Sequence, residues 1–258
     1  MKHALFGIAL FTLGATANAS SQSLARLVAD APAGAVQFSF AARAGVCGGG
    51  REVIRIGRST FGTFSWRNSA RDACEHGPVH VLLARRGKET TGLRAYVADS
   101  STDGVTDIGS VSAREAADYL LAIAPRLPSS AGSRAVLAAA IADSAVIWPT
   151  LLTLARDAGV RRETRETATF WLGRAVSVVA TGQPDTALDE DAEDDATSVR
   201  TQAVFVLSQL SNNEGVPELL EIARRHRDAV IRKRAIFWLG QSGDARALEL
   251  FEELLQGK

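Results

Sequence analysis

The chain has 258 residues, of which 46% are hydrophobic and 22% are charged, with 29 basic and 29 acidic side chains. This length fits one large domain or two small ones. Because the two charges balance, there is no overall basic excess of the kind that attracts nucleic acid, and we expect no nucleic-acid partner.

The first 19 residues have the pattern of a secretory signal peptide. Lys2 and His3 form a short basic start, Ala4 to Ala15 is largely apolar, and Ala17-Asn18-Ala19 supplies a small-x-small cleavage site. The apolar run is shorter than the roughly 20 residues of a membrane-spanning helix. No further long apolar run follows, so we expect cleavage after Ala19 and a periplasmic or secreted protein without a membrane span.

Residues 20–111 are expected to form a small β-rich domain. It opens with a helical candidate at Ser23 to Ala29. The strand candidates alternate apolar and polar residues: Val36 to Phe40, Val53 to Ile56 and Phe61 to Trp66. Val79 to Arg85 and Thr90 to Val97 flank a glycine-containing turn and predict a β-hairpin. Since an isolated hairpin is marginal in water, we expect these strands to share a sheet with one buried face.

Both cysteines, Cys47 and Cys74, lie in this segment. In an exported chain an even pair predicts a disulfide, here closing a loop of 27 residues. Two alternatives stay open. The cysteines are free thiols, or they bind a metal together with His76 and His80, although this spacing matches no standard zinc module.

From Ser112 onward the apolar period becomes helical, which predicts a second domain at residues 112–258. Ser112 and Glu115 form a capping box ahead of Ala116 to Ala124. A template then recurs in which Ala follows Arg by three residues and Leu follows Ala by four, so Ala and Leu share a helical face. Its clear copies are Arg165/Ala168/Leu172, Arg200/Ala203/Leu207 and Arg232/Ala235/Leu239. Arg134 begins a looser copy, and the four arginines are 31, 35 and 32 residues apart.

A second pattern alternates with this template. Pro149 to Arg156 and Pro217 to Arg224 share the order Pro-x-Leu-Leu-x-Leu/Ile-Ala-Arg. Each unit is therefore expected to hold a first helix with the Arg template and a second helix, the last running from Ala245 to Leu255. Such units cannot bury their apolar faces alone and must stack. After Gly173 the expected second helix is missing, and we interpret the acidic stretch near 182–196 as a solvated insertion.

Two further template positions carry expectations. Trp171 and Trp238 occupy the same position in two copies, and aromatic residues that recur in this way are expected in the core because they bury large areas. The template Arg is expected to bond the neighbouring unit, with solvation of the helix start as the alternative.

These patterns resemble HEAT repeats, and in particular the short HEAT-like repeats named after the phycobilisome lyases. The resemblance covers Ser133 to Leu255 and is strongest in the last two units. The whole chain is similar to exported bacterial proteins that place a small β-rich, two-cysteine segment before such an array. The resemblance implies an α+β protein with a C-terminal α-solenoid of short helix pairs, used for protein recognition without a settled activity.

The leading hypothesis is thus an exported, non-catalytic scaffold that binds a protein partner. The resemblance places second helices on the binding surface, where eight charged side chains are expected outside: Glu218, Glu221, Arg224, Arg225, Arg246, Glu249, Glu252 and Glu253. A lyase-like enzyme and a ligand or metal receptor centred on the cysteine segment are the alternatives. The array holds no cysteine and one histidine, His226, so we expect no catalytic residue, cofactor or metal.

Overall fold

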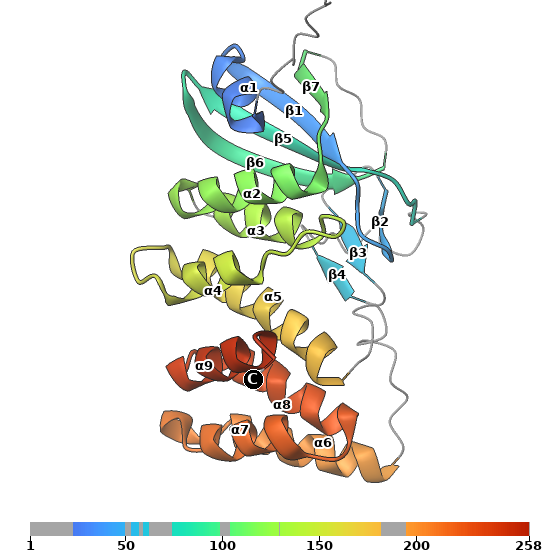
Figure 1. Cartoon of the computed structure of the whole chain (residues 1–258), viewed down its shortest axis with the longest axis vertical. Coiled ribbons are helices and arrows are strands. Elements are labelled where there is room, and N and C mark those ends of the chain that lie inside the picture. The colour runs from blue at the N-terminus through green and yellow to red at the C-terminus, as the bar shows by residue number, and fades with distance from the viewer. Residues whose placement is uncertain are drawn as a thin grey trace, which may run out of the picture.

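The computed structural model describes residues 23–49, 53–56, 59–61, 74–98, 104–128, 130–181 and 195–257. The predicted signal peptide with its cleavage site, and most of the acidic stretch near 182–196, lie outside these residues. The molecule is mixed in class, with strands at one end and stacked helices over the rest (Figure 1). The predicted combination of a β-rich segment and a helical C-terminal region is confirmed.

Four strands form a mixed sheet in the order β6-β5-β1-β7. Strand β1 (Gly34–Phe40) is antiparallel to β5 (Val79–Arg86), and β5 forms a hairpin with β6 (Glu89–Val97). Gly87 in the turn has φ +61°, as a two-residue hairpin loop requires. The hairpin is therefore confirmed. Strand β7 (Thr106–Ser110), parallel to β1, was not predicted, because it is an edge strand without a clear apolar alternation.

A second, smaller sheet has the order β2-β3-β4, with β2 at Val46–Gly48, β3 at Ile54–Ile56 and β4 at Ser59–Phe61. The predicted disulfide joins Cys47 of β2 to Cys74, with 5.2 Å between the Cα atoms, a normal separation for such a bond. Gly48 and Glu75 exchange backbone hydrogen bonds beside it. Of the predicted strand Phe61 to Trp66, only Phe61 lies within the described ranges, and it is the last residue of β4.

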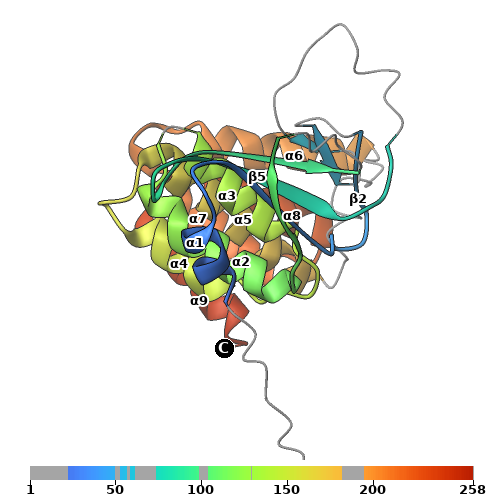
Figure 2. The same cartoon turned by 90° about the horizontal axis from the view of Figure 1, so that it is seen from above.

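Three helices complete the sheet end of the molecule. Helix α1 (Leu24–Asp30) is held at its start by a hydrogen bond from Leu24 N to Glu115 Oε1 (2.6 Å), and at its end by buried Arg85, which donates to Ala31 O (2.6 Å). Helices α2 (Ala113–Ile123) and α3 (Ala131–Ala140) lie beneath the sheet, which crosses over them when seen from above (Figure 2). Ser112 caps α2 as predicted, but Glu115 bonds Leu24 instead of closing a capping box.

The remaining helices form two layers. Their bounds are α4 (Trp148–Arg156), α5 (Arg162–Thr181), α6 (Asp195–Ser208), α7 (Val216–Arg225), α8 (Ala229–Gln241) and α9 (Ala245–Leu255). First helices α3, α5, α8 and α6 follow one another in one layer, and second helices α4, α9 and α7 do so in the other (Figure 1). One hydrophobic core runs from Leu24 to Phe251, so the predicted boundary at residue 111 does not coincide with a break in the core.

The units do not stack in the order of the chain. The pair α8–α9, last in sequence, lies between α4–α5 and α6–α7 (Figure 1). Stacking in chain order would instead place α6 beside α5. No helix among the described residues between α5 and α6 serves as a second helix for α5, and α9 packs against α5 instead. Buried Phe251 of α9 faces Gly173 of α5 and Gly240 of α8, where an added Cβ atom would lie 3.7 and 3.9 Å from its ring.

The Ala and Leu positions of the template are buried in two of the three clear copies. Ala168 and Leu172 of α5, and Ala235 and Leu239 of α8, are completely buried. In α6 the prediction is wrong for Ala203, which is exposed, and Leu207 is only partly buried. The reason is that α6 ends the stack, so its outer side has no neighbouring unit among the described residues.

Two of the four template arginines tie their first helix to the turn before it. Arg165 Nη1 donates to Val160 O (2.7 Å), and Arg232 Nη1 donates to His226 O (2.7 Å) at the end of α7. The expected bond to the neighbouring unit is thus present at Arg232. Arg134 instead reaches Leu93 O of β6 (3.4 Å), and Arg200 lies in α6 with its side chain outside the described part.

Candidate protein interface

The charged face of the second helices is held together by its own ion pairs. Arg156 of α4 pairs with Glu252 of α9 at 2.7 Å, and Arg224 of α7 pairs with Glu253 of α9 at 2.9 Å. Surface pairs of this kind contribute roughly 0–1 kcal/mol each. They nevertheless pair three of the charged residues that were predicted to bind a partner, namely Arg224, Glu252 and Glu253.

The eight residues predicted for this face all reach solvent, to different degrees. The exposed ones are Glu218, Glu221, Arg224, Arg225, Arg246 and Glu249, while Glu252 and Glu253 are partly buried. Arg225 pairs with Glu221 in its own helix (2.8 Å) and Arg246 pairs with Asp244 (2.8 Å). The opposite side of α7 is buried as predicted at Leu219, Leu220 and Ala223 and partly buried at Ile222. Their role in binding stays a prediction.

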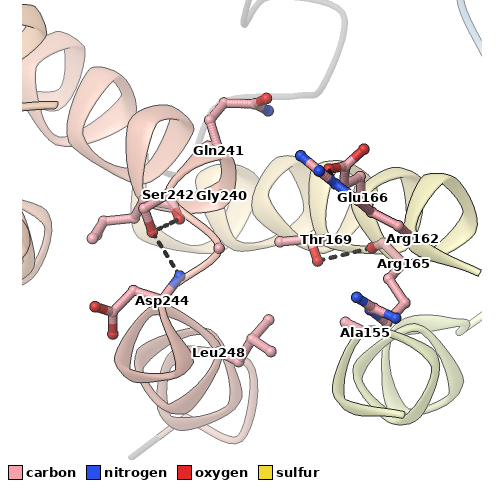
Figure 3. A pocket seen from close by; sticks show the side chains of 12 residues that line it. Ala155, Arg162, Arg165, Glu166, Thr169, Gly240, Gln241, Ser242, Asp244 and Leu248 are labelled. Carbon is pink, nitrogen blue, oxygen red and sulfur yellow. Dashed lines mark hydrogen bonds and ion pairs between the residues drawn. The ribbon is translucent and has the colours of Figure 1, made fainter. Parts of the chain in front are cut away.

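A cavity of about 450 Å³ lies where α5 meets the end of α8 (Figure 3). Arg162 and Glu166 form an ion pair beside it (2.7 Å). Thr169 Oγ1 donates to Arg165 O (2.9 Å), and Ser242 Oγ donates to Leu239 O (2.7 Å). The hydroxyl groups of this cavity therefore bond the backbone of their own helices and are not paired with a base that would activate them.

Asp244, the acidic residue at the turn beside this cavity, caps helix α9. Its carboxylate accepts from Arg246 N (2.9 Å) and from the Arg246 guanidinium (Nη2, 2.8 Å). The hydrogen bond from the Arg246 side chain lowers the pKa of Asp244 from 3.8 to about 2. A carboxylate with so low a pKa is a weak proton acceptor near neutrality, so its geometry suits a helix cap and not a general base.

The described histidines are engaged in the fold at separate places. His76 Nδ1 lies 2.8 Å from Val46 O, the His80 ring stacks on Tyr96 with 5.5 Å between centroids, and His226 Nδ1 accepts from Asp228 N (3.1 Å). The disulfide uses both sulfur atoms. In this structure Cys47 and Cys74 are therefore neither free thiols nor thiolate ligands of a metal, the two alternatives left open by the sequence.

Two template copies carry the same aromatic pair on the outer side of a first helix. In α5 the pair is Phe170–Trp171, and it is covered by Phe61 of β4, whose ring centroid lies 5.9 Å from Phe170 and 5.2 Å from Trp171. The guanidinium groups of Arg43 and Arg174 also lie over Trp171, at 5.3 and 5.7 Å. Trp171 is consequently buried, as predicted.

The corresponding pair in α8, Phe237–Trp238, is left partly open. Phe205 of α6 contacts Trp238 with 5.1 Å between centroids, yet Phe237 is 41% exposed and Phe205 is 36% exposed. Val206, the next residue of α6, and Leu210, just after that helix, are 53% and 43% exposed. We call Phe205, Val206, Leu210 and Phe237 the α6–α8 aromatic surface. It holds four of the five exposed large hydrophobic side chains of the described residues, the fifth being Val146.

Sequence reasoning missed this surface. It placed the recurring Trp positions in the core, but Trp238 is only partly buried and the Phe before it lies outside. The available signal was the repeat of Phe-Trp-Leu-Gly at residues 170–173 and 237–240. That repeat identifies equivalent positions but not which of them another element covers.

A family model described as HEAT repeats matches residues 185–258. The match includes all of α6 to α9, so the C-terminal part of the chain carries a HEAT-repeat sequence, as predicted. Comparisons with curated proteins and with solved structures find no match. None of the helices in the described ranges is both long and apolar enough to cross a bilayer.

Proposed function

We propose that the mature protein is an exported, non-catalytic scaffold that binds a protein partner through a short α-solenoid of HEAT-like repeats, similar to those of the phycobilisome-lyase type. The HEAT-repeat match supports this proposal, because arrays of such units commonly provide extended surfaces for protein recognition. The non-catalytic part is supported by the cavity between α5 and α8, whose hydroxyl groups bond their own backbone.

The observation that carries the proposal is the α6–α8 aromatic surface. Phe205 and Phe237 leave large parts of their rings in solvent although both contact Trp238. The exposed rings of Phe205 and Phe237 thus adjoin at Trp238, and exposed apolar side chains that lie together mark sites of protein association. Aromatic side chains are also enriched at the centres of such interfaces. We therefore place the partner on this surface, with the charged face of the second helices as the second candidate.

Export is supported by two observations. The N-terminal sequence ends its apolar run in a small-x-small site at Ala17 to Ala19, and the Cys47–Cys74 disulfide suits an oxidising compartment. Intact-mass measurement of the protein from its producing cell should show a chain that begins at Ser20. A mass that retains residues 1–19 would contradict the proposal of cleavage.

The binding proposal is tested by affinity capture from the envelope fraction of the producing cell. The wild-type protein should retain one defined protein, and Phe237→Glu should lose it, since a charge on this surface disfavours apolar contact. Val146→Glu, which places the same charge on an exposed apolar residue between α3 and α4, is the matched control and should retain it. Loss only in an Arg224→Glu/Arg225→Glu variant would move the site to the second helices. A bound small molecule in place of a protein would favour the receptor or the lyase-like enzyme.

A further inference from the structure

The two aromatic pairs lie in the same helical setting. Phe170 to Gly173 and Phe237 to Gly240 share the order Phe-Trp-Leu-Gly. In both helices the Leu is completely buried, and both glycines face the ring of Phe251. With these inner sides matched, the Phe of each copy lies on the outer flank of its helix. The flank of α8 is thus the counterpart of the flank of α5, one helix further along the stack (Figure 1).

The flank of α5 shows what such a site accepts. Its cover is an extended segment, β4, which among the described strands pairs with β3 at the edge of the small sheet. From this strand Phe61 contacts both rings of the pair, so three aromatic rings are in mutual contact: Phe61, Phe170 and Trp171. A strand can deliver one side chain to a flat helical flank because successive residues point to opposite sides.

The flank of α8 has only part of this cover. Phe205 reaches Trp238 from the neighbouring helix α6, and Phe237, which also contacts that ring, remains 41% exposed. Resting on the proposed function, we infer that the α6–α8 aromatic surface receives an extended segment of a partner protein, whose aromatic side chain packs on Phe237 as Phe61 packs on Phe170. Offset or edge-to-face packing of such rings is favourable beyond the area that it buries.

This inference specifies the occupant by chemistry. A helix pair added to the end of the stack would cover the outer side of α6, whereas Phe237 belongs to α8, inside the stack. The chain's own example of a covered flank is a strand with a phenylalanine, not a helix. Self-association through this surface would be a different outcome, which the test distinguishes from the binding of a partner segment.

The test uses the full mature protein and a fluorescent octapeptide with the sequence of residues 56–63, which contains Phe61. Fluorescence anisotropy should show binding, and Phe→Tyr or Phe→Trp at the position of Phe61 should preserve it. Phe→Ala in the peptide should weaken binding about tenfold or more, which corresponds to about 1.4 kcal/mol. Phe237→Glu in the protein should weaken binding as much, while Val146→Glu, on an exposed apolar residue outside this surface, should leave it unchanged. Thermal melting of each variant confirms that the fold persists.

Three results would overturn the inference. The first is the absence of binding at peptide concentrations up to about 1 mM. The second is equal binding by the Phe→Ala peptide or by the Phe237→Glu protein. The third is a dimer in light scattering that Phe237→Glu converts to a monomer, because the surface would then bind a second copy. Partner capture can still depend on Phe237 when the peptide does not bind. In that case the proposed scaffold function is retained, and only the inference of an extended aromatic segment is rejected.

Discussion

The flank of α5 and the flank of α8 present the same four residues, Phe-Trp-Leu-Gly, to different surroundings. At α5 the small disulfide-linked sheet places Phe61 on the pair, and Trp171 is buried. At α8 the ring that the described residues place on the pair from another helix is Phe205, and Phe237 stays exposed. The difference shows that a repeat makes positions equivalent along a helix, whereas a segment from elsewhere decides which copy becomes core and which remains available for binding.

The inner sides of the two helices show the opposite behaviour. Both copies use a buried Leu and a small Gly to receive helix α9, whose Phe251 lies against Gly173 and Gly240 at once. The shared interior gives the two helices a common support, and the outer flanks distinguish them. Mutations that remove the common support or change one flank therefore separate stability from binding.

Removal of the common support should have the largest effect. Phe251→Ala empties a fully buried site between α5 and α8, and we expect a loss of about 3–5 kcal/mol in the free energy of unfolding. Urea denaturation of the mature protein measures it. A loss below about 1 kcal/mol in the free energy of unfolding would mean that Phe251 does not fill the site between the two template helices.

The next comparison is between the two template leucines of α8 and α6. Leu239→Ala should cost about 2–5 kcal/mol because Leu239 is completely buried. Leu207→Ala should cost clearly less, about 1 kcal/mol, since Leu207 is only partly buried at the end of the stack. Equal losses in urea denaturation would show that the outer side of α6 is covered in solution.

Loss of the disulfide should make the flank of α5 resemble that of α8. A Cys47→Ser/Cys74→Ser variant loses a 27-residue closure, worth about 3 kcal/mol on the loop-entropy estimate. Because β2 belongs to the sheet that carries Phe61, we also expect a red shift of tryptophan emission as Trp171 gains solvent. Unchanged emission in the folded variant would mean that β4 stays on α5 without the bond. Reducing agent should not affect this variant.

The two phenylalanines can be compared directly. Phe170→Ala should destabilise by about 2 kcal/mol, since Phe170 is partly buried and contacts Phe61. Phe237→Ala should stay within about 0.5 kcal/mol of the wild type but weaken partner capture. Thermal melting and capture on the same two variants test both statements. If Phe237→Ala destabilised the protein more than Phe170→Ala, the conclusion that the flank of α5 is covered and the flank of α8 is exposed would be wrong.

The smallest effect concerns the start of α9. The pKa of Asp244 falls from 3.8 to about 2 on folding, so its carboxylate stabilises the folded state above about pH 3.8. That contribution is lost as the pH falls from 3.8 to 2. Asp244→Ala should therefore cost about 1 kcal/mol at pH 7, a usual value for an N-cap, and nearly nothing near pH 2. Denaturation of both proteins at the two pH values checks this, and a pH-independent difference would contradict it.

Local features of this protein were determined by its sequence alone. The Val79–Val97 hairpin follows from strand alternation on either side of a turn with glycine at positive φ. Ser112 and Asp244 cap the helices that they precede. The buried Ala and Leu of α5 and α8 follow from their four-residue spacing. These features depend on neighbours within a few residues, and periodicity and turn chemistry report such neighbours directly.

The arrangement of equivalent parts was decided only in the tertiary structure. Template helices with the same apolar face can each fit beside α5, so the pattern does not say that α8 lies there and α6 at the end. For the same reason it does not foretell that Ala203 is exposed, that Arg224 pairs with Glu253, or that Phe61 covers Phe170 and not Phe237. Each outcome depends on contacts between segments far apart in the chain, and these follow from the burial that the whole fold achieves.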